Sequence, residues 1–489
     1  MNPDRSNDLH CPALRPGSEW PGRLRPATAV PRTQAGSVLI GLLWCLALLT
    51  VLVVGLLHSA SLDLQLTRHY QDRIQARYLA LAGIERTKAL LYQDARDRSR
   101  SDQSHSGTLF NDPSRFRDVV LGRGTYRVFR GGRVDEGGGL IFGVSDEESR
   151  LDLNQAEADA LGRLPDMTPD LTPAILDWRD SDNAALPGGA ERDYYASLQP
   201  PSQPRNGPLP SVRELLLVRG IPPERFWGDD PHGTGLGESA DDERGADGNA
   251  SSSQRPGWVS FLTVHSGVRN VSATGQERIN IQSADEASLT SVRGITAAIA
   301  KAIIAHRGPR KFESLADLLD VSSTPPSEAA SPSGPGNPPE GAPIPNAPPS
   351  VRGPAPGGPK LIDQTLLLEI ADFVTIDEDR LQKGVVNVNT ASLEVLSCLP
   401  GVSRELAQAI IAFRGSNGFL ANVAWLLRVP GMTPDIFKSL APLVTTRSET
   451  FRILAEGRVR SSGVRQRIQA IVRVDLNDVQ TLAYREDNL

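Results

Sequence analysis

The chain has 489 residues, of which 39% are hydrophobic and 22% charged, and its formal net charge is −6. A chain of this length accommodates about two to four compact domains, and its balanced composition excludes a wholly disordered or collagen-like protein. The sequence pI of about 5.8 disfavours a strongly basic nucleic-acid binder.

The cysteines are few and widely spaced: Cys11, Cys45 and Cys398. The first two lie in or before an apolar segment, so Cys398 has no partner for a disulfide bond in the regions that follow. Neither CxxC nor Cys/His zinc spacing occurs. The fold therefore depends on its own apolar cores.

The apolar segment is a membrane-anchor candidate. No Asp, Glu, Lys or Arg occurs between Arg32 and Asp63. The apolar run over 38–57 would span about 30 Å as a helix, the thickness of the bilayer core. We predict a transmembrane helix over 37–62. A buried helix of a soluble domain and a secretory signal are alternatives, but the run is apolar on all sides and exceeds the usual signal core of about 7–15 residues.

The helical pattern continues beyond the anchor. Apolar residues recur at helical spacing at Leu62, Leu66, Tyr70, Ile74, Tyr78 and Leu81. Arg68, Asp72, Arg73 and Arg77 lie on the other faces. A membrane helix that continues as an amphipathic helix is typical of a pilin-like stem. Lys and Arg are not clearly biased to one end of the apolar run, so the positive-inside rule leaves the orientation open.

One pattern then recurs three times. It consists of an alternating apolar/Asn strand, an Ala-rich helix start, a tight turn and a Leu-Leu-rich segment. We predict three helical units, each made of two short helical hairpins, over 151–228, 279–376 and 386–445. The third repeat is complete, with a helix over 406–414, and it resembles helix-hairpin-helix domains.

Two segments read as linkers. Residues 322–360 hold 13 prolines in 39 positions and should be extended and polyproline-like. A more specific interpretation is that this segment is a ligand for SH3-type domains, but such domains are not expected outside the cytoplasm. Residues 229–278 combine an acidic, Gly- and Ser-rich linker with a strand.

Alternating segments flank the helical units. Residues 451–459 and 468–474, separated by Ser461-Ser462-Gly463, predict an antiparallel hairpin. With the strand at 124–129 they should form a sheet against the stem. The predicted fold is α+β: a stem and early strands over 63–150, an α-helical insertion, and late strands over 446–489.

Acidic residues gather on one short loop, at Asp177, Asp180, Asp182, Glu191 and Asp193. Asp180, Asp182 and Glu191 have the spacing of positions 1, 3 and 12 of an EF-hand. Alanine stands at positions 5 and 6, so the loop is not an EF-hand. Several carboxylates on one loop still favour a divalent cation, and the absence of a nearby His disfavours Zn²⁺. A solvated acidic loop that follows the helix ending near Arg179 is the alternative.

Residues 34–40, Gln-Ala-Gly-Ser-Val-Leu-Ile, resemble a type IV prepilin cleavage site. The resemblance implies cleavage between Gly36 and Ser37, which makes 1–36 the leader; a start at Val30 is an alternative that shortens it. The fifth mature residue is Gly41, where most pilin-like proteins have Glu. An unpaired carboxylate in hydrocarbon costs about 2.5–3.5 kcal/mol, and a subunit at a fibre tip has no subunit above it to supply a partner.

The chain is similar to the protein K family of type II secretion minor pseudopilins. The resemblance rests on Asp-Trp-x-Asp-x-Asp at 177–182, Gly-Ala-Glu-x-x-Tyr-Tyr at 189–195 and Phe-Leu-Thr-Val-x-Ser at 261–266. It implies a structural Ca²⁺ ion held by Asp180, Asp182 and Glu191, with Asp177 or Asp193 as a possible addition. The Pro-rich insertion and the additional helical unit depart from the family pattern.

The resemblance also implies the partners and the location. The partners are two other minor pseudopilins in a tip complex, the major pseudopilin, the prepilin peptidase and the inner membrane. The tip complex primes assembly of a pseudopilus for protein export across the outer membrane. The chain would cross the inner membrane once, carry a methylated mature N-terminus, and have its bulk in the periplasm.

The sequence argues against two other classes of function. A membrane-anchored DNA-binding protein similar to the competence protein ComEA would hold phosphate with a Gly-x-Gly turn, but here Ser403 follows Gly401 in place of the second glycine. The third unit has a net charge of only +1, so nucleic acid is not expected as a partner. No catalytic constellation or phosphate loop is evident, so we predict no enzyme activity.

Overall fold

The computed structural model describes residues 35–101, 107–229, 255–323 and 359–486. Residues 1–34 of the predicted leader lie outside these ranges. Most of the Pro-rich insertion and residues 230–254 of the first linker lie outside them as well. The chain divides into two compact units, with the boundary between Arg68 and His69. We call residues 35–68 the anchor segment and the described residues from 69 onward the head.

Helix α1 (Ala35–Ser101) contains the anchor segment and the predicted stem in one continuous helix. It contains no proline, and its first part is uncharged and rich in Leu and Val. It is the one helix in the described ranges that is long and apolar enough to cross a membrane. The apolar side chains from Val38 to Leu66 are exposed.

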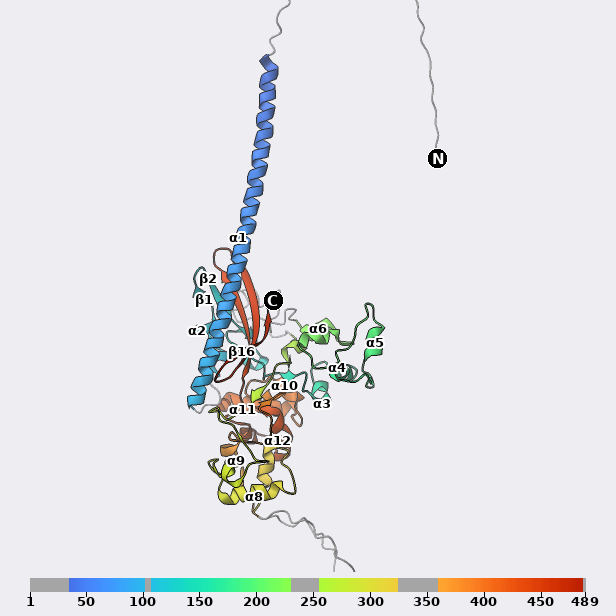
Figure 1. Ribbon diagram of the computed structural model, residues 1–489, viewed down its shortest axis with the longest axis vertical. Coiled ribbons are helices and arrows are strands. Elements are labelled where there is room, and N and C mark those ends of the chain that lie inside the picture. The colour runs from blue at the N-terminus through green and yellow to red at the C-terminus, as the bar shows by residue number, and fades with distance from the viewer. Residues whose placement is uncertain (1–34, 102–106, 230–254, 324–358, 487–489) are drawn as a thin grey trace, which may run out of the picture. The chain divides into compact units, whose positions relative to one another are not determined.

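The head contains a sheet with three long strands from the end of the chain and many short helices (Figure 1). In the described ranges the helices after α1 are α2 (Pro113–Phe116), α3 (Ala158–Gly162), α4 (Leu171–Arg179), α5 (Arg192–Ala196), α6 (Pro223–Trp227), α7 (Glu286–Thr290), α8 (Ala297–Arg307), α9 (Gln364–Ile370), α10 (Leu393–Cys398), α11 (Arg404–Asn417) and α12 (Pro434–Leu440). The 3-10 helices used below are η3 (Val212–Leu217), η7 (Leu315–Asp320) and η8 (Val423–Arg428).

The main sheet has the strand order β1-β2-β14-β15-β16, and β5 also pairs with β14. Its strands are β1 (Val119–Leu121), β2 (Gly124–Val128), β5 (Ser145–Asp146), β14 (Thr450–Val459), β15 (Arg465–Val474) and β16 (Val479–Arg485). All pairings are antiparallel, and β14 joins the early strands to the late ones. The predicted α+β fold and C-terminal hairpin are confirmed, with β16 as a strand that the alternation did not reveal.

The stem packs on this sheet on a face different from the predicted apolar one. Ala76, Leu79 and Ala80 are buried against the sheet, while Tyr70, Ile74 and Tyr78 on the predicted apolar face are more than half exposed. The reason is a close approach of backbones: a Cβ on Gly457 of β14 would lie 2.0 Å from the Ala76 carbonyl oxygen. At this point the stem presents Ala76 and Ala80, whose short side chains allow the two backbones to come this close.

The remaining strands are short and lie in or beside the helical units. They are β3 (Arg130–Gly131), β4 (Leu140–Ile141), β6 (Leu151–Asp152), β7 (Leu262–Thr263), β8 (Val268–Arg269), β9 (Ile279–Asn280), β10 (Val374–Thr375), β11 (Leu381–Gln382), β12 (Val386–Asn387) and β13 (Val444–Thr445). A strand at the start of each helical unit pairs in parallel with a strand that closes it: β6 with β7, β9 with β10 and β12 with β13. The closing strand of the first unit, β7, lies in the segment 229–278, beyond the predicted bounds of that unit. Each unit is thus a closed loop of chain.

The predicted alternating strands are shorter than expected, because a turn begins after two residues. In each unit the second strand residue accepts a hydrogen bond from the backbone two residues on, as from Asn389 N to Asn387 Oδ1 at 2.9 Å. The same contact occurs at Asp152 (2.8 Å) and Asn280 (2.8 Å). Such Asx turns compete with the β ladder for the backbone groups.

Two further side chains repeat in every unit. An arginine near the end of the second helix donates to the carbonyl oxygen of the residue that follows the first strand. The pairs are Arg179 with Leu153, Arg307 with Ile281 and Arg414 with Val388. An amide side chain of the Asx turn donates to the segment before the 3-10 helix, and the pairs are Asn154 with Leu209, Gln282 with Phe312 and Asn389 with Leu420. These contacts tie the start of each unit to both of its hairpins.

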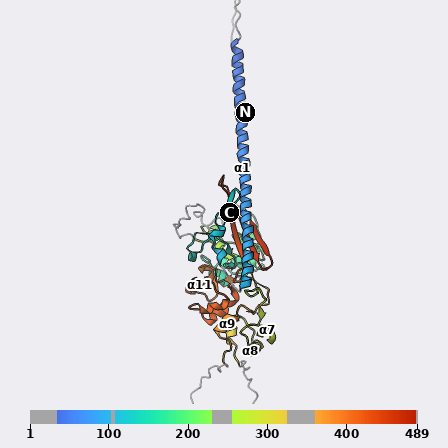
Figure 2. The same ribbon diagram turned by 90° about the vertical axis from the view of Figure 1, so that its left-hand side faces the viewer.

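The second unit is inserted through a narrow neck. Its neighbours β8 and β11 pair antiparallel, so the chain enters and leaves the unit side by side. The unit lies at the end of the head opposite the sheet, with α7, α8 and α9 below α11 (Figure 2). Asn422 Nδ2 donates to Leu368 O at 2.8 Å and Lys438 pairs with Asp317 at 2.6 Å, so the second and third units are bonded directly.

A buried acidic triplet joins the sheet to the helical units. Asp146, Glu147 and Glu148 are at most 4% exposed. Asp146 accepts from Asn387 Nδ2 at 3.1 Å in the third unit. Burial raises the pKa of Glu148, and the neighbouring Asp146 carboxylate raises it further, well above its ordinary range. Although burial also raises the pKa of Glu147, the Arg452 and Arg150 guanidinium groups lower it to about 2.

Glu148 is expected to make the protein less stable as pH rises. A carboxyl whose pKa is raised on folding stabilises the folded state below its unfolded pKa, near 4.3, and this contribution is lost as pH rises through the folded pKa. Glu148→Gln, which stays neutral, should remove up to about 1.4 kcal/mol of this loss per pH unit within that window. Urea unfolding of the full chain in detergent at pH 5 to 8 measures the difference. The exposed control Glu157→Gln should keep the wild-type slope, and an unchanged slope in Glu148→Gln would show that Glu148 is charged throughout.

Candidate functional site

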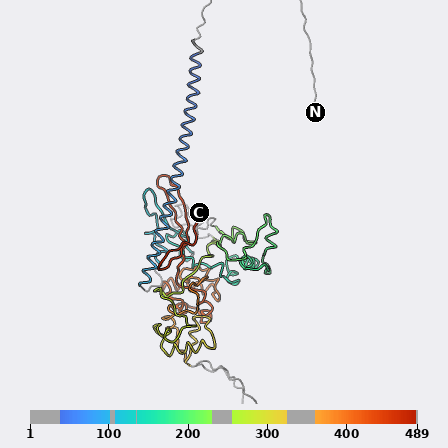
Figure 3. The backbone as a smooth tube through the Cα atoms, viewed as in Figure 1, coloured from blue at the N-terminus to red at the C-terminus, as the bar shows by residue number. Residues whose placement is uncertain are grey.

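The carboxylate cluster lies between two helices of the first unit. Asp177 is in the last turn of α4, Asp180 is the residue that ends this helix, and Glu191 immediately precedes α5. The loop between Asp180 and Glu191 returns the chain to α4. In Figure 3 this part of the first unit is the green excursion to one side of the head.

The structure brings together three of the five acidic residues predicted from the sequence. One carboxylate oxygen from each of Asp177, Asp180 and Glu191 lies within 4.8 Å of the other two. Two oxygens that bind the same Ca²⁺ ion at about 2.4 Å can be at most about 4.8 Å apart. The three side chains therefore have the separation that a shared divalent cation requires.

Several of these oxygens lack partners. Glu191 is 4% exposed, and no donor in the described residues has hydrogen-bonding geometry to either of its carboxylate oxygens. Its position before α5 would allow it to cap the helix, yet its side chain makes no cap bond. Asp180 Oδ1 is likewise buried and unbonded within the described ranges. Buried unpaired carboxylate oxygens are costly, so this geometry fits a cation better than a solvated loop.

The electrostatics agree with the geometry. Burial raises the pKa of Asp177, Asp180 and Glu191 above the ordinary values. For Glu191 the Asp180 and Asp177 carboxylates raise it further. Each charge therefore destabilises the others, and a cation between them would relieve the repulsion.

The loop can approach Asp177 because it carries a glycine there. A Cβ on Gly189 would lie 1.9 Å from Asp177 Oδ2, a separation no side chain tolerates. Asp177 also accepts from Leu186 N at 3.2 Å, which holds the first half of the loop. The Gly-Gly-Ala-Glu sequence at 188–191 thus lets the backbone pass the Asp177 carboxylate before Glu191 turns in.

The other two predicted ligands lie outside this group. Asp182 is exposed and accepts from Ala184 N at 2.8 Å, although its charge contributes to the raised pKa of Asp180. Asp193 is exposed in the first turn of α5. Of the predicted cleavage site, Gly36 and Ser37 lie in the first turn of α1.

Sequence reasoning missed two groups of residues. The Asp146–Glu148 triplet could have been noticed as three successive acids shortly before the predicted strand that begins at Leu151. Arg219, which bonds to the loop of the carboxylate cluster, lies in the second hairpin of the unit and no local pattern marked it. Its contacts join residues about 30 positions apart in the chain.

The hairpin turn of the third unit, which would hold phosphate in a DNA-binding protein, contacts another part of the head. Arg163 at the end of α3 donates to the Leu399 carbonyl oxygen at 2.8 Å. Leu399 is 3% exposed, and Gly401 packs near Ile436 of α12. The hairpin turn of the third unit therefore packs against the first unit.

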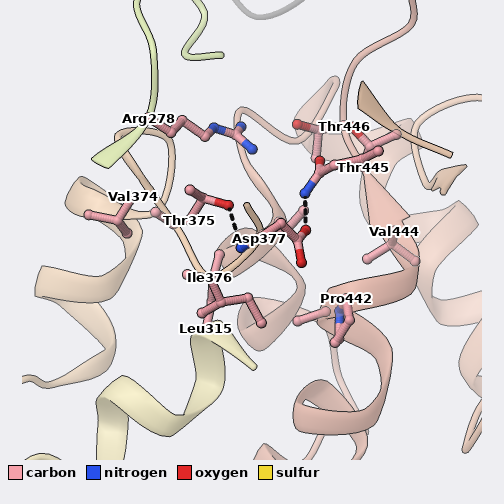
Figure 4. A pocket seen from close by; sticks show the side chains of 14 residues that line it. Arg278, Leu315, Val374, Thr375, Ile376, Asp377, Pro442, Val444, Thr445 and Thr446 are labelled. Atoms are coloured by element: carbon pink, nitrogen blue, oxygen red, sulfur yellow. Dashed lines mark hydrogen bonds between the residues drawn. The ribbon is translucent and has the colours of Figure 1, made fainter. Parts of the chain in front are cut away.

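A recess between the second and third units is lined by their closing strands (Figure 4). Its polar groups are already bonded: Asp377 N donates to Thr375 Oγ1 at 3.1 Å, and Gln382 Nε2 donates to Asp377 Oδ2 at 2.5 Å. Arg278, at its edge, pairs with Asp372 at 3.1 Å. The recess is therefore a contact between two packed units, and its polar side chains bond to one another and do not point toward a common ligand position.

Comparison with family models gives two matches. The model of type II secretion system protein K matches residues 149–227, the segment that contains the carboxylate cluster. The helix-hairpin-helix motif model matches residues 274–330 and 382–445, which correspond to the second and third units.

Individual proteins give the same picture. The chain is 30% identical over 193 residues to type II secretion system protein K of Klebsiella pneumoniae, which is 38% of this chain and 58% of that protein. It thus spans a little over half the length of that curated relative. ComE operon protein 1 of Bacillus subtilis is 32% identical over 73 residues, covering 15% of this chain and 36% of that protein.

A solved structure is also similar in outline. A chain of the GspK-GspI-GspJ complex from the enterotoxigenic Escherichia coli type 2 secretion system aligns over 86% of this chain and 99% of that chain. The TM-score is 0.42 and the sequence identity is 12%, values too low to carry an inference about residues or contacts.

Proposed function

Since this chain belongs to the type II secretion system protein K family, we propose that it is the minor pseudopilin at the tip of a type II secretion pseudopilus. In this role it joins two other minor pseudopilins in a tip complex that primes assembly of the major pseudopilin. The match of the protein K model to residues 149–227 is the observation that carries the proposal. The role is structural, in protein export, and no residue is assigned to catalysis.

The anchor segment supports a single-pass position in the inner membrane, with the head in the periplasm. The uncharged run at 38–57 has the length of a bilayer core, and the same helix continues into the stem that packs on the sheet. Gly41 supports the tip position. A tip subunit has no neighbour above it to neutralise a buried Glu, so glycine avoids a charge in hydrocarbon.

Within this role we assign the carboxylate cluster to a structural Ca²⁺ ion held by Asp177, Asp180 and Glu191. Carboxylate oxygens are the ligands that this hard cation prefers, and Glu191 has no other partner among the described residues. A bound ion would connect the end of α4 to the start of α5 and so cross-link the loop at 181–190. Asp182 is close enough to add to the negative potential of the site.

The prepilin assignment predicts a defined mature N-terminus. In cells that secrete through this system, the chain should begin at Ser37. Gly36→Val should retain the leader and leave exported proteins in the periplasm, because a branched side chain blocks close approach of the peptidase to the backbone at the cleaved bond. N-terminal sequencing and a secretion assay measure both. Gly55→Val, in the same helix with open space around it, is the control and should behave as wild type. Normal secretion by Gly36→Val would contradict the proposal.

The calcium assignment predicts an ion-dependent melting temperature. Calcium at a hundred times its Kd should stabilise the full chain in detergent by about 2.7 kcal/mol. The double variant Asp180→Ala/Glu191→Ala should lose this gain. Its ion-free form should be no less stable than the ion-free wild type, because the mutual repulsion of the carboxylates is reduced.

Gly189→Ala provides an independent test by calorimetry. The added methyl group displaces Asp177 or the loop, so Ca²⁺ affinity should fall at least about tenfold. Gly162→Ala is the matched control, since its nearest neighbour is 3.9 Å away, and it should bind as wild type. Wild-type binding by Gly189→Ala would place the ion elsewhere.

A further inference from the structure

Arg219 reaches the carboxylate loop from the other hairpin of the first unit. It follows η3 in the turn before α6. Its Nη1 donates to the Gly189 carbonyl oxygen at 2.8 Å, and its Nη2 donates to the Gly188 carbonyl oxygen at 2.5 Å. One guanidinium group therefore holds two successive peptide groups of the segment that leads to Glu191.

Arg219 is itself held in place. Its backbone N–H donates to the Tyr195 hydroxyl at 3.1 Å, and its guanidinium lies 5.3 Å from the centre of the Tyr194 ring. Tyr195 is 1% exposed and packs edge-on against Trp178 with ring centres 5.0 Å apart. Trp178 lies between the two aspartates of the cluster in the chain. Arg219 thus contacts α5 directly, through Tyr194 and Tyr195, and is linked to α4 through the packing of Tyr195 on Trp178.

The segment that Arg219 holds passes very close to the Asp177 carboxylate. Gly189 passes Asp177 so closely that no side chain fits, and Glu191 follows two residues later. Leu186 N anchors the earlier part of the loop on Asp177. The Asp177 carboxylate also accepts from the Ala190 backbone. Among the described contacts, however, Arg219 alone bonds to the Gly188 and Gly189 carbonyl groups, which would be left unbonded without it.

We propose that Arg219 is the positioning residue of the calcium site: it fixes the Gly188–Gly189 backbone so that Glu191 reaches the ion beside Asp177 and Asp180. This inference rests on the proposed Ca²⁺ site. Arginine suits the task because its planar group donates two parallel N–H bonds, whereas lysine presents a single ammonium point charge. Arg219 binds no ion, and its contribution is geometric.

A purely electrostatic role predicts the opposite sign. The positive charge of Arg219 lies near Asp177 and offsets part of the rise that burial causes in the pKa of that carboxyl. If this charge merely competed with the ion, its removal would tighten Ca²⁺ binding. If Arg219 positions the loop, its removal weakens binding despite the lost repulsion, so the direction of the change separates the two roles.

The test is a calcium titration of the full chain in detergent, by calorimetry and by melting temperature with and without Ca²⁺. Arg219→Met should bind about tenfold more weakly because two hydrogen bonds are lost, equivalent to about 1.4 kcal/mol of ion-linked stabilisation. Arg219→Lys, which keeps the charge but not the paired donors, should lie between Arg219→Met and wild type. Arg225→Met is the control: Arg225 is half-buried on α6 beside Trp258, and the variant should bind as wild type.

The outcomes distinguish the two proposals. If the wild type binds Ca²⁺ and Arg219→Met binds it equally well or more tightly, the positioning role is overturned and the calcium site stands. Absence of binding by the wild type overturns the calcium site, and with it the role of Arg219. If Arg219→Met does not fold, Arg219→Lys decides: affinity equal to wild type contradicts the need for paired donors, and weaker binding with an unchanged ion-free melting temperature supports it.

Discussion

Burial of the acidic triplet at Asp146–Glu148 is the constraint on which the arrangement of the head depends. Each carboxylate must be satisfied by groups from elsewhere, because unpaired charges in a low-dielectric interior are costly. Glu147 binds Arg452 on the sheet and Thr263 at the end of the first unit. Glu148 accepts from Gly267 N and Thr450 N, both at 3.1 Å. One short segment thereby joins the sheet, the first helical unit and the chain that leads to the second.

The helical units use a different device, repeated in each of them. An arginine on the second helix and an amide from the Asx turn bind the backbone around the first strand, as Arg414 and Asn389 do in the third unit. The parallel closure of first and last strands completes the unit. A unit closed in this way tolerates insertions at its turns, since its ends remain together. The second unit illustrates this by carrying the Pro-rich segment between η7 and α9.

The first unit has the same backbone plan and carries the carboxylate loop. The carboxylate loop occupies the connection after α4, and Arg219 in the second hairpin holds it from across the unit. An ion at Asp177, Asp180 and Glu191 would hold this loop in place, as buried apolar side chains hold other segments of the head. The third unit uses its own hairpin turn differently, as a contact for Arg163 of the first unit. The helical units therefore share a backbone plan and differ in what their loops contact.

The sequence by itself determined the features that depend on neighbouring residues. The uncharged run at 38–57, the alternating hairpin at 451–474, the three repeats and the acidic loop all follow from local spacing and composition. Tertiary structure decided which surfaces meet. It placed the Ala76 face of the stem on the sheet, because Gly457 permits the close approach. It also selected three of the five acidic residues for one cluster and brought Arg219 to their loop. These choices depend on contacts between residues far apart in the chain, and such contacts leave no periodic pattern in the sequence.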